Sequence, residues 1–481
     1  MSFLKKLFSR SSDEEQSART ETSTHQPASN QKKQNKTKAK KNAGQGKSKK
    51  SSRKEEPPEV ISLPEDFAVL DLPLPLQQAI QKLGFQSCTP VQNEVLPHSL
   101  DGSDIIAQAQ TGTGKTAAFL LSVITYHIEN PEHEKRPPGT PFSLVIAPTR
   151  ELVMQIASDA EQLSEYADFD VVATVGGIDY EKQKKQLLNN VDLVIATPGR
   201  LLDFCRSRVI DLSKVEMLII DEADRMLSMG FIPDVKAIIQ RTPKKQNRQT
   251  QLFSATFSED IKRLSASWTL DPVRVEIAPD QVAVDSVEQL VYLTSADQKY
   301  TVLYNLVMSD EVDRIIVFVN RRDETRMLEE KLNRHNINSG LLTGEVPQKK
   351  RISTLDKFKS GEIKVLVATD VAGRGIHVDG ISHVVNYNLP EDSEDYVHRI
   401  GRTGRAGADG VSISLACEDD SFMLPNIEAL LGDALKCLQP PEELLVKPPP
   451  YSKPPRPKAP RSDNNKRGGN DRGNRGRHRG R

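Results

Sequence analysis

Cysteine is scarce in this chain: four of its 481 residues, at Cys88, Cys205, Cys417 and Cys437. They are far apart in the sequence, with no CxxC pair and no neighbouring pair of histidines. The sequence therefore gives no basis for a disulfide framework or a zinc site. We expect these cysteines to be buried, reduced thiols.

Long apolar runs are also missing. No stretch approaches the roughly 18 uncharged apolar residues of a membrane-spanning helix. Residues 1–10 include Lys5, Lys6 and Arg10 and lack the apolar core and cleavage site of a secretory signal. We therefore expect a cytoplasmic protein with no integral membrane association.

Acidic and basic residues balance at 66 each, but they are unevenly distributed. Residues 1–60 have a net charge of +8 and residues 447–481 one of +10, which leaves 61–446 at −18. The two ends are so poor in apolar residues that burial cannot offset the entropy of ordering them. We expect disordered basic tails at 1–60 and 447–481 around a folded, acidic centre.

Both tails have a feature of their own. Arginine alternates with glycine through much of 466–481, and guanidinium groups on a supple backbone can pair with phosphates and stack on bases. We interpret this tail as an RNA tether, and the alternative is a tail that only aids solubility.

The apolar residues from Phe3 to Phe8 share one face of a short helical pattern. That face is either a weak contact for an anionic membrane or a partner, or a frayed leader.

The centre repeats a short apolar run, a turn and a helical stretch. Because both faces of these runs are apolar, they predict parallel strands covered by helices. The runs are Asp104–Ala109, Ser143–Ala147, Val191–Ala196, Val215–Ile220, Gln251–Phe253, Arg314–Val319, Ile363–Ala368, His383–Tyr387 and Val411–Ala416. We expect an α/β fold of two parallel-sheet domains, at 61–271 and 289–446, joined by a linker at 272–288 and separated by a cleft. In such sheets, ligands bind beyond the carboxyl ends of the strands.

A phosphate-binding loop follows the first run. Gly112, Thr113 and Gly114 let backbone N–H groups point at a phosphate, and Lys115 can neutralise the β- and γ-phosphates. The hydroxyl of Thr116 is a ligand for Mg²⁺. This loop, between a strand and a helix, predicts a nucleoside triphosphate site.

Two acids, Asp221 and Glu222, follow the run that ends at Ile220. Carboxylates at the mouth of an apolar strand are costly without a cation. We expect Asp221 to hold Mg²⁺ and Glu222 to polarise the attacking water. The alternative is a solvated helix N-terminus with acidic caps.

An arginine-rich turn at 398–405 lies in the second set of elements. Its glycines suit a turn that points Arg402 and Arg405 across the cleft at the γ-phosphate, as arginine fingers. The alternative is a basic turn on the surface. If the arginines arrive only when the domains close, hydrolysis depends on whatever closes them.

Six motifs together identify a family. They are Ala109–Thr116, Pro148–Leu152, Thr197–Arg200, Asp221–Asp224, Ser254–Thr256 and His398–Arg405. In this order they resemble DEAD-box ATP-dependent RNA helicases, over about residues 61–440. The resemblance implies two RecA-like domains, ATP and Mg²⁺ as cofactors, and RNA as the partner that prompts closure.

The resemblance also assigns individual residues. Phe67 would stack on adenine and Gln92 would hydrogen-bond it, which favours ATP over GTP. Gly375 and His377 would complete the nucleotide contacts. His377 replaces the family's usual acid, so we expect loose coupling to the nucleotide and a low intrinsic ATPase activity. His377→Asp should raise the RNA-stimulated ATPase activity. The RNA groove would be lined by Pro148, Thr149, Arg150, Gly176, Gly177, Thr197, Pro198, Gly199, Arg200, Arg321, Thr343, Gly344, Thr369 and Asp370. Closure would be transmitted by Asp224, Ser254, Thr256 and His398.

Stretches such as 344–351 and 413–418 are most similar to a bacterial branch of the family that is associated with mRNA-degrading complexes. That similarity implies an RNase E-type endoribonuclease and polynucleotide phosphorylase as partners of a monomeric motor. Two other functions are an RNA clamp without turnover, which the intact Lys115, Glu222 and Arg402 argue against, and a DNA-translocating helicase. The latter lacks the expected additional wedge or strand-tracking domain.

Overall fold

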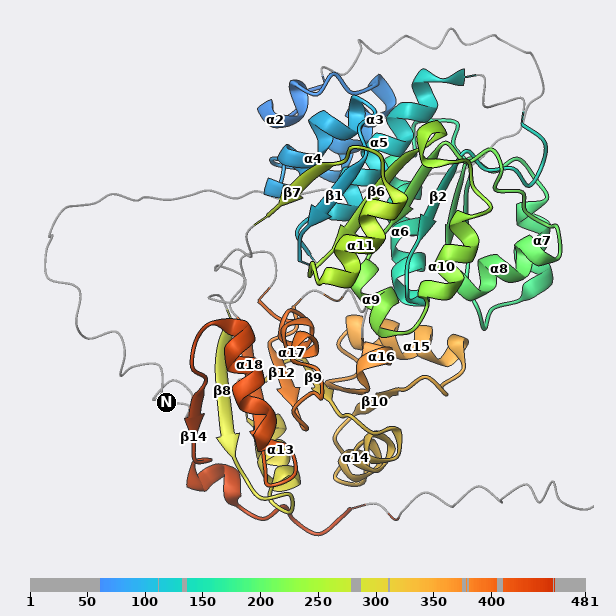
Figure 1. Cartoon of the computed structure of the whole chain (residues 1–481). Helices are drawn as coiled ribbons and strands as arrows, with labels where there is room; N and C mark the ends of the chain where they lie inside the picture. The colour runs from blue at the N-terminus through green and yellow to red at the C-terminus, as the bar shows by residue number, and fades with distance from the viewer. Residues whose placement is uncertain are drawn as a thin grey trace, which may run out of the picture.

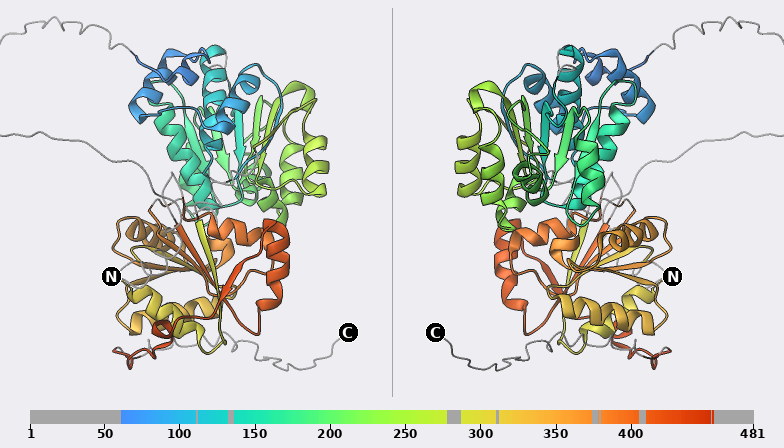
Figure 2. Two further views of the ribbon diagram at one scale, coloured as in Figure 1. Left: turned by 90° about the vertical axis from the view of Figure 1, so that its left-hand side faces the viewer. Right: turned by 90° about the vertical axis from the view of Figure 1, so that its right-hand side faces the viewer.

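The computed structural model has two lobes stacked one on the other, each built around a seven-stranded parallel sheet (Figure 1; Figure 2). This confirms the predicted fold class. The structure describes residues 61–110, 112–131, 136–277, 287–309, 312–373, 378, 380–404, 410–452 and 454. The predictions for residues 1–60, and for most of 447–481, lie outside these residues.

The first lobe has the strand order β3-β4-β2-β5-β6-β1-β7. The strands are β1 (Ile105–Gln108), β2 (Ser143–Ile146), β3 (Val171–Thr174), β4 (Leu193–Ala196), β5 (Met217–Ile220), β6 (Gln249–Ser254) and β7 (Val273–Glu276). Alternate residues of the central strands enter separate hydrophobic clusters, as Val145 and Leu144 of β2 do. Both faces of the sheet are therefore buried, which explains why these strands are apolar throughout.

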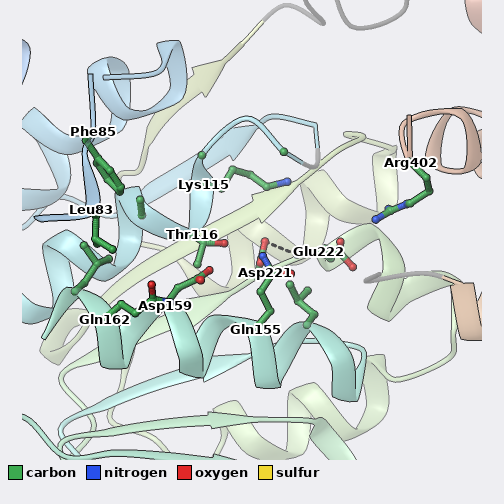
Figure 3. Close-up of a pocket in the computed structure, with 15 residues that line it drawn as sticks. Leu83, Phe85, Lys115, Thr116, Gln155, Asp159, Gln162, Asp221, Glu222 and Arg402 are labelled. Atoms are coloured by element: carbon green, nitrogen blue, oxygen red, sulfur yellow. Dashed lines mark hydrogen bonds between the residues drawn. The ribbon is translucent and has the colours of Figure 1, made fainter. Parts of the chain in front are cut away.

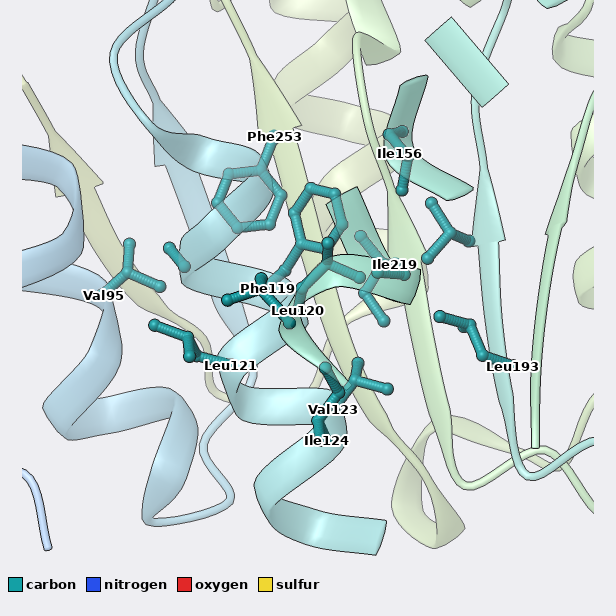
Figure 4. Packing of buried hydrophobic residues seen from close by; sticks show 14 of the residues in the cluster. Val95, Phe119, Leu120, Leu121, Val123, Ile124, Ile156, Leu193, Ile219 and Phe253 are labelled. Atoms are coloured by element: carbon teal, nitrogen blue, oxygen red, sulfur yellow. The ribbon is translucent and has the colours of Figure 1, made fainter. Parts of the chain in front are cut away.

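Helices cover both faces of this sheet. They are α2 (Glu65–Ala68), α3 (Leu74–Leu83), α4 (Pro90–Leu100), α5 (Lys115–Glu129), α6 (Arg150–Leu163), α7 (Tyr180–Leu187), α8 (Pro198–Arg206), α9 (Ala223–Ser228), α10 (Ile232–Ile239) and α11 (Glu259–Trp268). Helix α5 packs its apolar face on the sheet, with the rings of Phe119 and Phe253 5.5 Å apart (Figure 4). This packing fixes the helix that begins at Lys115.

The second lobe has the strand order β10-β11-β9-β12-β13-β8-β14. Its strands are β8 (Val287–Leu293), β9 (Ile315–Phe318), β10 (Ser339–Leu342), β11 (Val365–Ala368), β12 (His383–Asn386), β13 (Gly410–Ala416) and β14 (Lys436–Leu438). Its helices are α13 (Lys299–Met308), α14 (Arg322–Arg334), α15 (Gln348–Lys359), α16 (Asp370–Gly373), α17 (Ser393–Ile400) and α18 (Leu424–Leu431). Within the described residues, no helix is long and apolar enough to cross a membrane.

Part of the expected linker at 272–288 belongs to the two sheets. β7 pairs with β1, and β8 begins at Val287 and pairs with β13. The sequence Val-Arg-Val-Glu of β7 alternates apolar and charged residues, as an edge strand does. We had predicted only runs that are apolar on both faces, so this strand was missed.

The first residues of the expected C-terminal tail pack on the second lobe. The ring of Tyr451 stacks on His335 with centroids 4.5 Å apart, and the guanidinium of Arg334 lies 3.7 Å from the Tyr451 centroid. The backbone N–H of Ser452 donates to Arg334 O at 3.0 Å. Aromatic stacking and hydrogen bonding therefore hold residues as far as Ser452 on the second lobe, where composition alone predicted disorder.

Candidate functional site

The phosphate-binding loop connects β1 to α5 by a backbone that requires glycine. Gly112 and Gly114 have φ of 90° and 92°, in the left-handed region. A Cβ on Gly114 would lie 2.6 Å from Nε2 of Gln92. The Lys115 side chain is buried, and its Nζ donates to Ala109 O at 2.6 Å. The loop thus holds the ammonium group at the carboxyl edge of the sheet.

The acid pair follows β5 and faces this loop. Asp221 and Glu222 are 2% and 5% exposed, and burial raises the pKa of Asp221 to about 6. Glu222 has a φ of 53°, a strained value for a residue with a side chain. Its Oε2 is buried and has no hydrogen-bond partner among the described residues. The oxygens of these buried carboxylates fit a divalent metal such as Mg²⁺, which prefers oxygen ligands.

An arginine of the second lobe completes the cavity. Arg402 follows α17, is 2% exposed, and lines the same cavity of about 330 Å³ as Lys115, Asp221 and Glu222. Figure 3 shows Lys115 and Arg402 approaching the two acids from opposite sides. Arg402 Nε donates to His398 O at 3.1 Å, which orients the guanidinium. The predicted partner Arg405 lies outside the described residues, as do Gly375 and His377.

The residues predicted to transmit closure meet at Asp224. Its Oδ2 accepts hydrogen bonds from the backbone N–H groups of Ala255 and Thr256 at 3.1 and 3.2 Å. Its own N–H donates to Ser254 Oγ at 3.3 Å. The Thr256 hydroxyl donates to Glu394 Oε2 at 3.4 Å, across the cleft on α17. A continuous polar path therefore leads from the acid motif to the second lobe.

The side chain of His398 lies beside this path and is largely shielded from solvent. Burial, together with the nearby Arg225, lowers the pKa of His398 to about 3. The side chain is therefore neutral at physiological pH. Arg225 itself is 2% exposed, and its Nη1 lies 3.5 Å from Oδ1 of Asp395 on α17. This cross-lobe ion pair was not predicted, although the acids in the first turn of α17 are visible in the sequence.

Two aromatic rings lie at the end of the cavity where the adenine is expected. Phe67 is 0% exposed and packs under Phe85, with ring centroids 5.8 Å apart. The Phe67 ring has no exposed surface in this arrangement, so stacking on a base would require it to become exposed, and its role stays a prediction. Phe85 is the aromatic residue that lines the cavity, beside Leu83. The amide of Gln92 bonds the backbone of its own domain, to Thr89 N and Gly114 O.

Because Phe85 lines the cavity and Phe67 is buried, we expect different effects when each is replaced by alanine. Phe85→Ala should raise the KM for ATP about tenfold, because stacking contributes roughly 1–3 kcal/mol per base. Phe67→Ala should instead lower the free energy of unfolding by about 3–5 kcal/mol through an empty core site. Nucleotide titration and thermal unfolding of both variants would distinguish the roles. A normal KM in Phe85→Ala would exclude that ring as the base platform.

The first-lobe groove residues lie on loops and helix starts at the cleft. Thr149 caps α6, with Oγ1 accepting from Leu152 N at 3.3 Å. Arg150 reaches across the cleft, and its Nη1 donates to Gln348 Oε1 at 3.2 Å. Gly177 lies beneath this guanidinium, where a Cβ would approach Nη1 to 2.5 Å. The remaining predicted residues lie before α6, after β3 or at the start of α8: Pro148, Gly176, Thr197, Pro198, Gly199 and Arg200.

Two second-lobe residues are placed differently from the prediction. The Thr343 side chain is 0% exposed, so it cannot line a groove in this arrangement. Asp370 binds Arg399 through both carboxylate oxygens, at 2.6 and 2.7 Å. Since a carboxylate would repel phosphate, this pairing explains how Asp370 is tolerated beside the cleft. Arg321, Gly344 and Thr369 lie at strand ends or helix starts near the cleft.

A further cross-cleft contact was not predicted. Arg351 Nε donates to Glu151 Oε1 at 2.9 Å, and Gln348 Nε2 donates to the same oxygen at 3.1 Å. Both charged side chains are largely buried, at 7% and 10% exposed. With Arg150 and Gln348, these groups form a polar bridge between α6 and α15.

Two parallel-sheet lobes, with a phosphate loop and acid pair on one and an arginine from the other in the same cavity, define a two-lobed nucleoside triphosphatase. The DEAD/DEAH box helicase family matches residues 89–264, and the helicase conserved C-terminal domain matches 298–407. The chain belongs to the DEAD-box helicase family.

Named relatives support the bacterial branch predicted from the sequence. The ATP-dependent RNA helicase RhlB of Pseudomonas putida is 56% identical over 376 residues, 78% of this chain and 94% of the relative. RhlB of Pseudomonas syringae pv. tomato is 57% identical over 371 residues, 77% and 94% of the two chains. Among solved structures, S. cerevisiae Dbp5 bound to RNA and ADP BeF3 has a TM-score of 0.69 and 30% identity, covering 78% of this chain and 95% of that one.

Proposed function

We propose that this protein hydrolyses ATP in response to RNA and uses closure of its lobes to separate short RNA duplexes. The observation that carries the proposal is Arg402 of the second lobe in the cavity formed by Lys115, Asp221 and Glu222 of the first. An active site divided between two lobes is complete only when they meet. A ligand that favours the closed arrangement of the two lobes, such as RNA in the cleft, therefore favours ATP hydrolysis.

The chemistry follows from the placement of the charged groups. Lys115 and Arg402 neutralise charge on the phosphates, and Glu222 orients and polarises the attacking water. Thr116 and Asp221 would hold Mg²⁺, which would neutralise charge on the β- and γ-phosphates. Phe85 and Leu83 provide an apolar wall for the base. Arg405, Gly375 and His377 keep their predicted roles in this proposal.

RNA is proposed to lie across both lobes at the carboxyl edges of the sheets. Backbone groups and Arg150, Arg200 and Arg321 would contact phosphates without reading sequence. RNA and ATP would each contact both lobes and so favour the closed state. Binding of one ligand should therefore strengthen binding of the other. The Dbp5 relative was solved with RNA and a phosphate analogue together, which supports a shared closed state.

The test compares nucleic acids in one assay. RNA should stimulate ATP turnover strongly and single-stranded DNA of the same sequence weakly, because sugar hydroxyls distinguish the two. A short RNA duplex should separate only with hydrolysable ATP or on closure by an ATP analogue. Equal turnover with and without RNA would contradict the proposal.

We further propose that the protein acts in the cytoplasm as a monomeric motor in mRNA degradation. The relatives named RhlB, at 56–57% identity, support this placement. The proposed partners are an endoribonuclease of the RNase E type and polynucleotide phosphorylase. Co-purification from lysate, with and without nuclease, tests whether these proteins bind directly; loss of both after nuclease treatment would contradict a protein contact.

A further inference from the structure

A buried arginine lies between the two lobes, immediately after the acid motif. Arg225 is in the first turn of α9, three residues beyond Glu222, and is 2% exposed. Helix α9 lies at the end of the first lobe that faces α17 of the second lobe (Figure 1). The proposed contacts with the phosphates, the attacking water and RNA do not involve this side chain.

The guanidinium of Arg225 is buried without hydrogen bonds. None of its three nitrogens has a hydrogen-bond partner among the residues that the structure describes. Arg399, which is 1% exposed, shows the usual state of a buried arginine: its Nε and Nη2 donate to the two oxygens of Asp370 at 2.6 and 2.7 Å. Buried polar groups normally have such partners, because burying them unpaired is costly. A role in packing alone therefore does not account for an arginine at position 225.

Carboxylates of both lobes surround this guanidinium. Burial lowers the pKa of Arg225, and four nearby carboxylates act in the opposite direction: Glu222, Asp224, Asp370 and Glu394. A fifth, Asp395 of α17, has its Oδ1 3.5 Å from Nη1 of Arg225. Two of the five belong to the first lobe and three to the second. Because like charges repel across a cleft with little water, a cation at this position favours the meeting of the lobes.

Arg225 also connects two groups that the proposed hydrolysis uses. On one side is Glu222, whose Oε2 is buried and has no hydrogen-bond partner in the described ranges. On the other side, Asp395 Oδ1 lies 3.9 Å from Nδ1 of His398, and His398 O accepts from Nε of Arg402 at 3.1 Å. Arg225 thus lies between the acid that polarises the water and the helix that leads to the arginine of the second lobe.

We propose that Arg225 is a positioning residue that sets Glu222 when α17 docks on the first lobe. A shift of about 0.5 Å would turn the 3.5 Å ion contact with Asp395 into a hydrogen bond. The guanidinium, fixed in this way, would donate to one oxygen of Glu222 while the other oxygen faces the attacking water. This inference rests on the proposed hydrolysis of ATP. It adds that docking of the second lobe prepares the water-activating acid as well as delivering Arg402.

The test measures closure and turnover separately in the full chain. Closure is measured as the ratio of the Kd for a labelled oligouridine strand without nucleotide to the Kd with ADP and beryllium fluoride. Turnover is measured as kcat and KM for ATP at saturating RNA. Arg225→Met removes the charge at similar length, so we expect the closure ratio to fall about tenfold and kcat about 100-fold. The Kd for ATP without RNA should stay within about twofold of the parent, because the phosphate loop is unchanged.

A conservative replacement separates the charge from the geometry. Arg225→Lys keeps a cation among the acids, so the closure ratio should return to within about threefold of the parent. Lysine cannot hold two carboxylates in a fixed planar fork, so kcat should stay about tenfold low. A residue that only stabilises the fold would not separate closure from kcat in this way.

Asp395 provides a second test that does not depend on a substitution in the core. Its side chain is 17% exposed, and Asp395→Asn should lower the closure ratio and kcat, as Arg225→Met does. If the two residues act as a pair, the double variant should be no worse than Arg225→Met alone. The matched control is the exposed pair Asp260 and Arg263 on α11. Asp260→Asn and Arg263→Met should leave both measurements at parental values.

A parental closure ratio and kcat in Arg225→Met would overturn the inference. Equal losses in Arg225→Lys and Arg225→Met, or additive effects of Asp395→Asn and Arg225→Met, would overturn it as well. If Arg225→Met does not fold, parental values in Asp395→Asn overturn the inference.

Glu222→Gln, measured alongside, keeps this failure distinct from a failure of the proposed function. This variant should lose turnover but keep the closure ratio, because its side chain has the same shape. Loss of turnover in Glu222→Gln with parental values in Arg225→Met would remove only the role of Arg225. Parental turnover in Glu222→Gln would remove the proposed hydrolysis site itself.

Discussion

Glu222→Gln should lower the RNA-stimulated kcat for ATP by about 10²–10⁴, the usual contribution of a positioned acid or base. The glutamine has the same shape but cannot take a proton from water. Glu222 is buried beside Asp221 and, in the described part of the structure, its Oε2 has no hydrogen-bond partner, so the carboxylate is available to the substrate. Steady-state turnover at saturating RNA measures the effect.

Binding should survive this change. The phosphate loop and the cross-cleft contacts remain, so ATP and RNA affinities should stay close to those of the parent. Glu443→Gln, the same chemical change on an exposed residue of the second lobe, should leave turnover unaffected. Parental turnover in Glu222→Gln would remove this residue from the reaction and, with it, the proposed hydrolysis site.

Arg402→Lys should have a similarly large effect, lowering kcat by about 10³. Lysine keeps the charge but loses the planar fork that can contact two phosphate oxygens. Because Arg402 comes from the second lobe, affinity for ATP in the absence of RNA should change little. Duplex separation should fail, since closure would no longer lead to turnover.

The control for this variant is Arg263→Lys, whose side chain on α11 is 79% exposed. It should match the parent in turnover and unwinding. If Arg402→Lys also matched the parent, the active site would not be shared between the lobes. If it lost RNA-independent ATP binding as well, Arg402 would be a binding residue and not one that acts on closure.

The sequence predicted those parts of the site that are contiguous in the chain. The phosphate loop at 112–116 and the acids at 221–224 follow apolar strands, so their position at the carboxyl edge was implied by the parallel sheet. Nine strands were predicted because both of their faces are apolar, but β3, β8 and β10 were not predicted. The edge strand β7 was not predicted because its apolar and charged residues alternate. Strand β14 was not predicted because it is short and partly polar.

Contacts between distant residues could not be predicted in the same way. Glu151 and Arg351 are 200 positions apart, and their pairing depends on how two lobes meet. The burial of Phe67 under Phe85 likewise depends on packing that no local pattern records. The family resemblance assigned only Phe67 to the base, and only the three-dimensional arrangement shows that Phe85 lines the cavity.

The bridge between the lobes is built from polar groups, and each hydrophobic cluster stays within one lobe. Opening the cleft therefore exchanges ion pairs and hydrogen bonds for water and exposes little hydrocarbon. Such an exchange should carry a small change in heat capacity, since that quantity tracks apolar surface. The enthalpy of opening should then be nearly constant with temperature, so the free-energy difference between open and closed forms should change linearly on heating, and it should respond clearly to ionic strength.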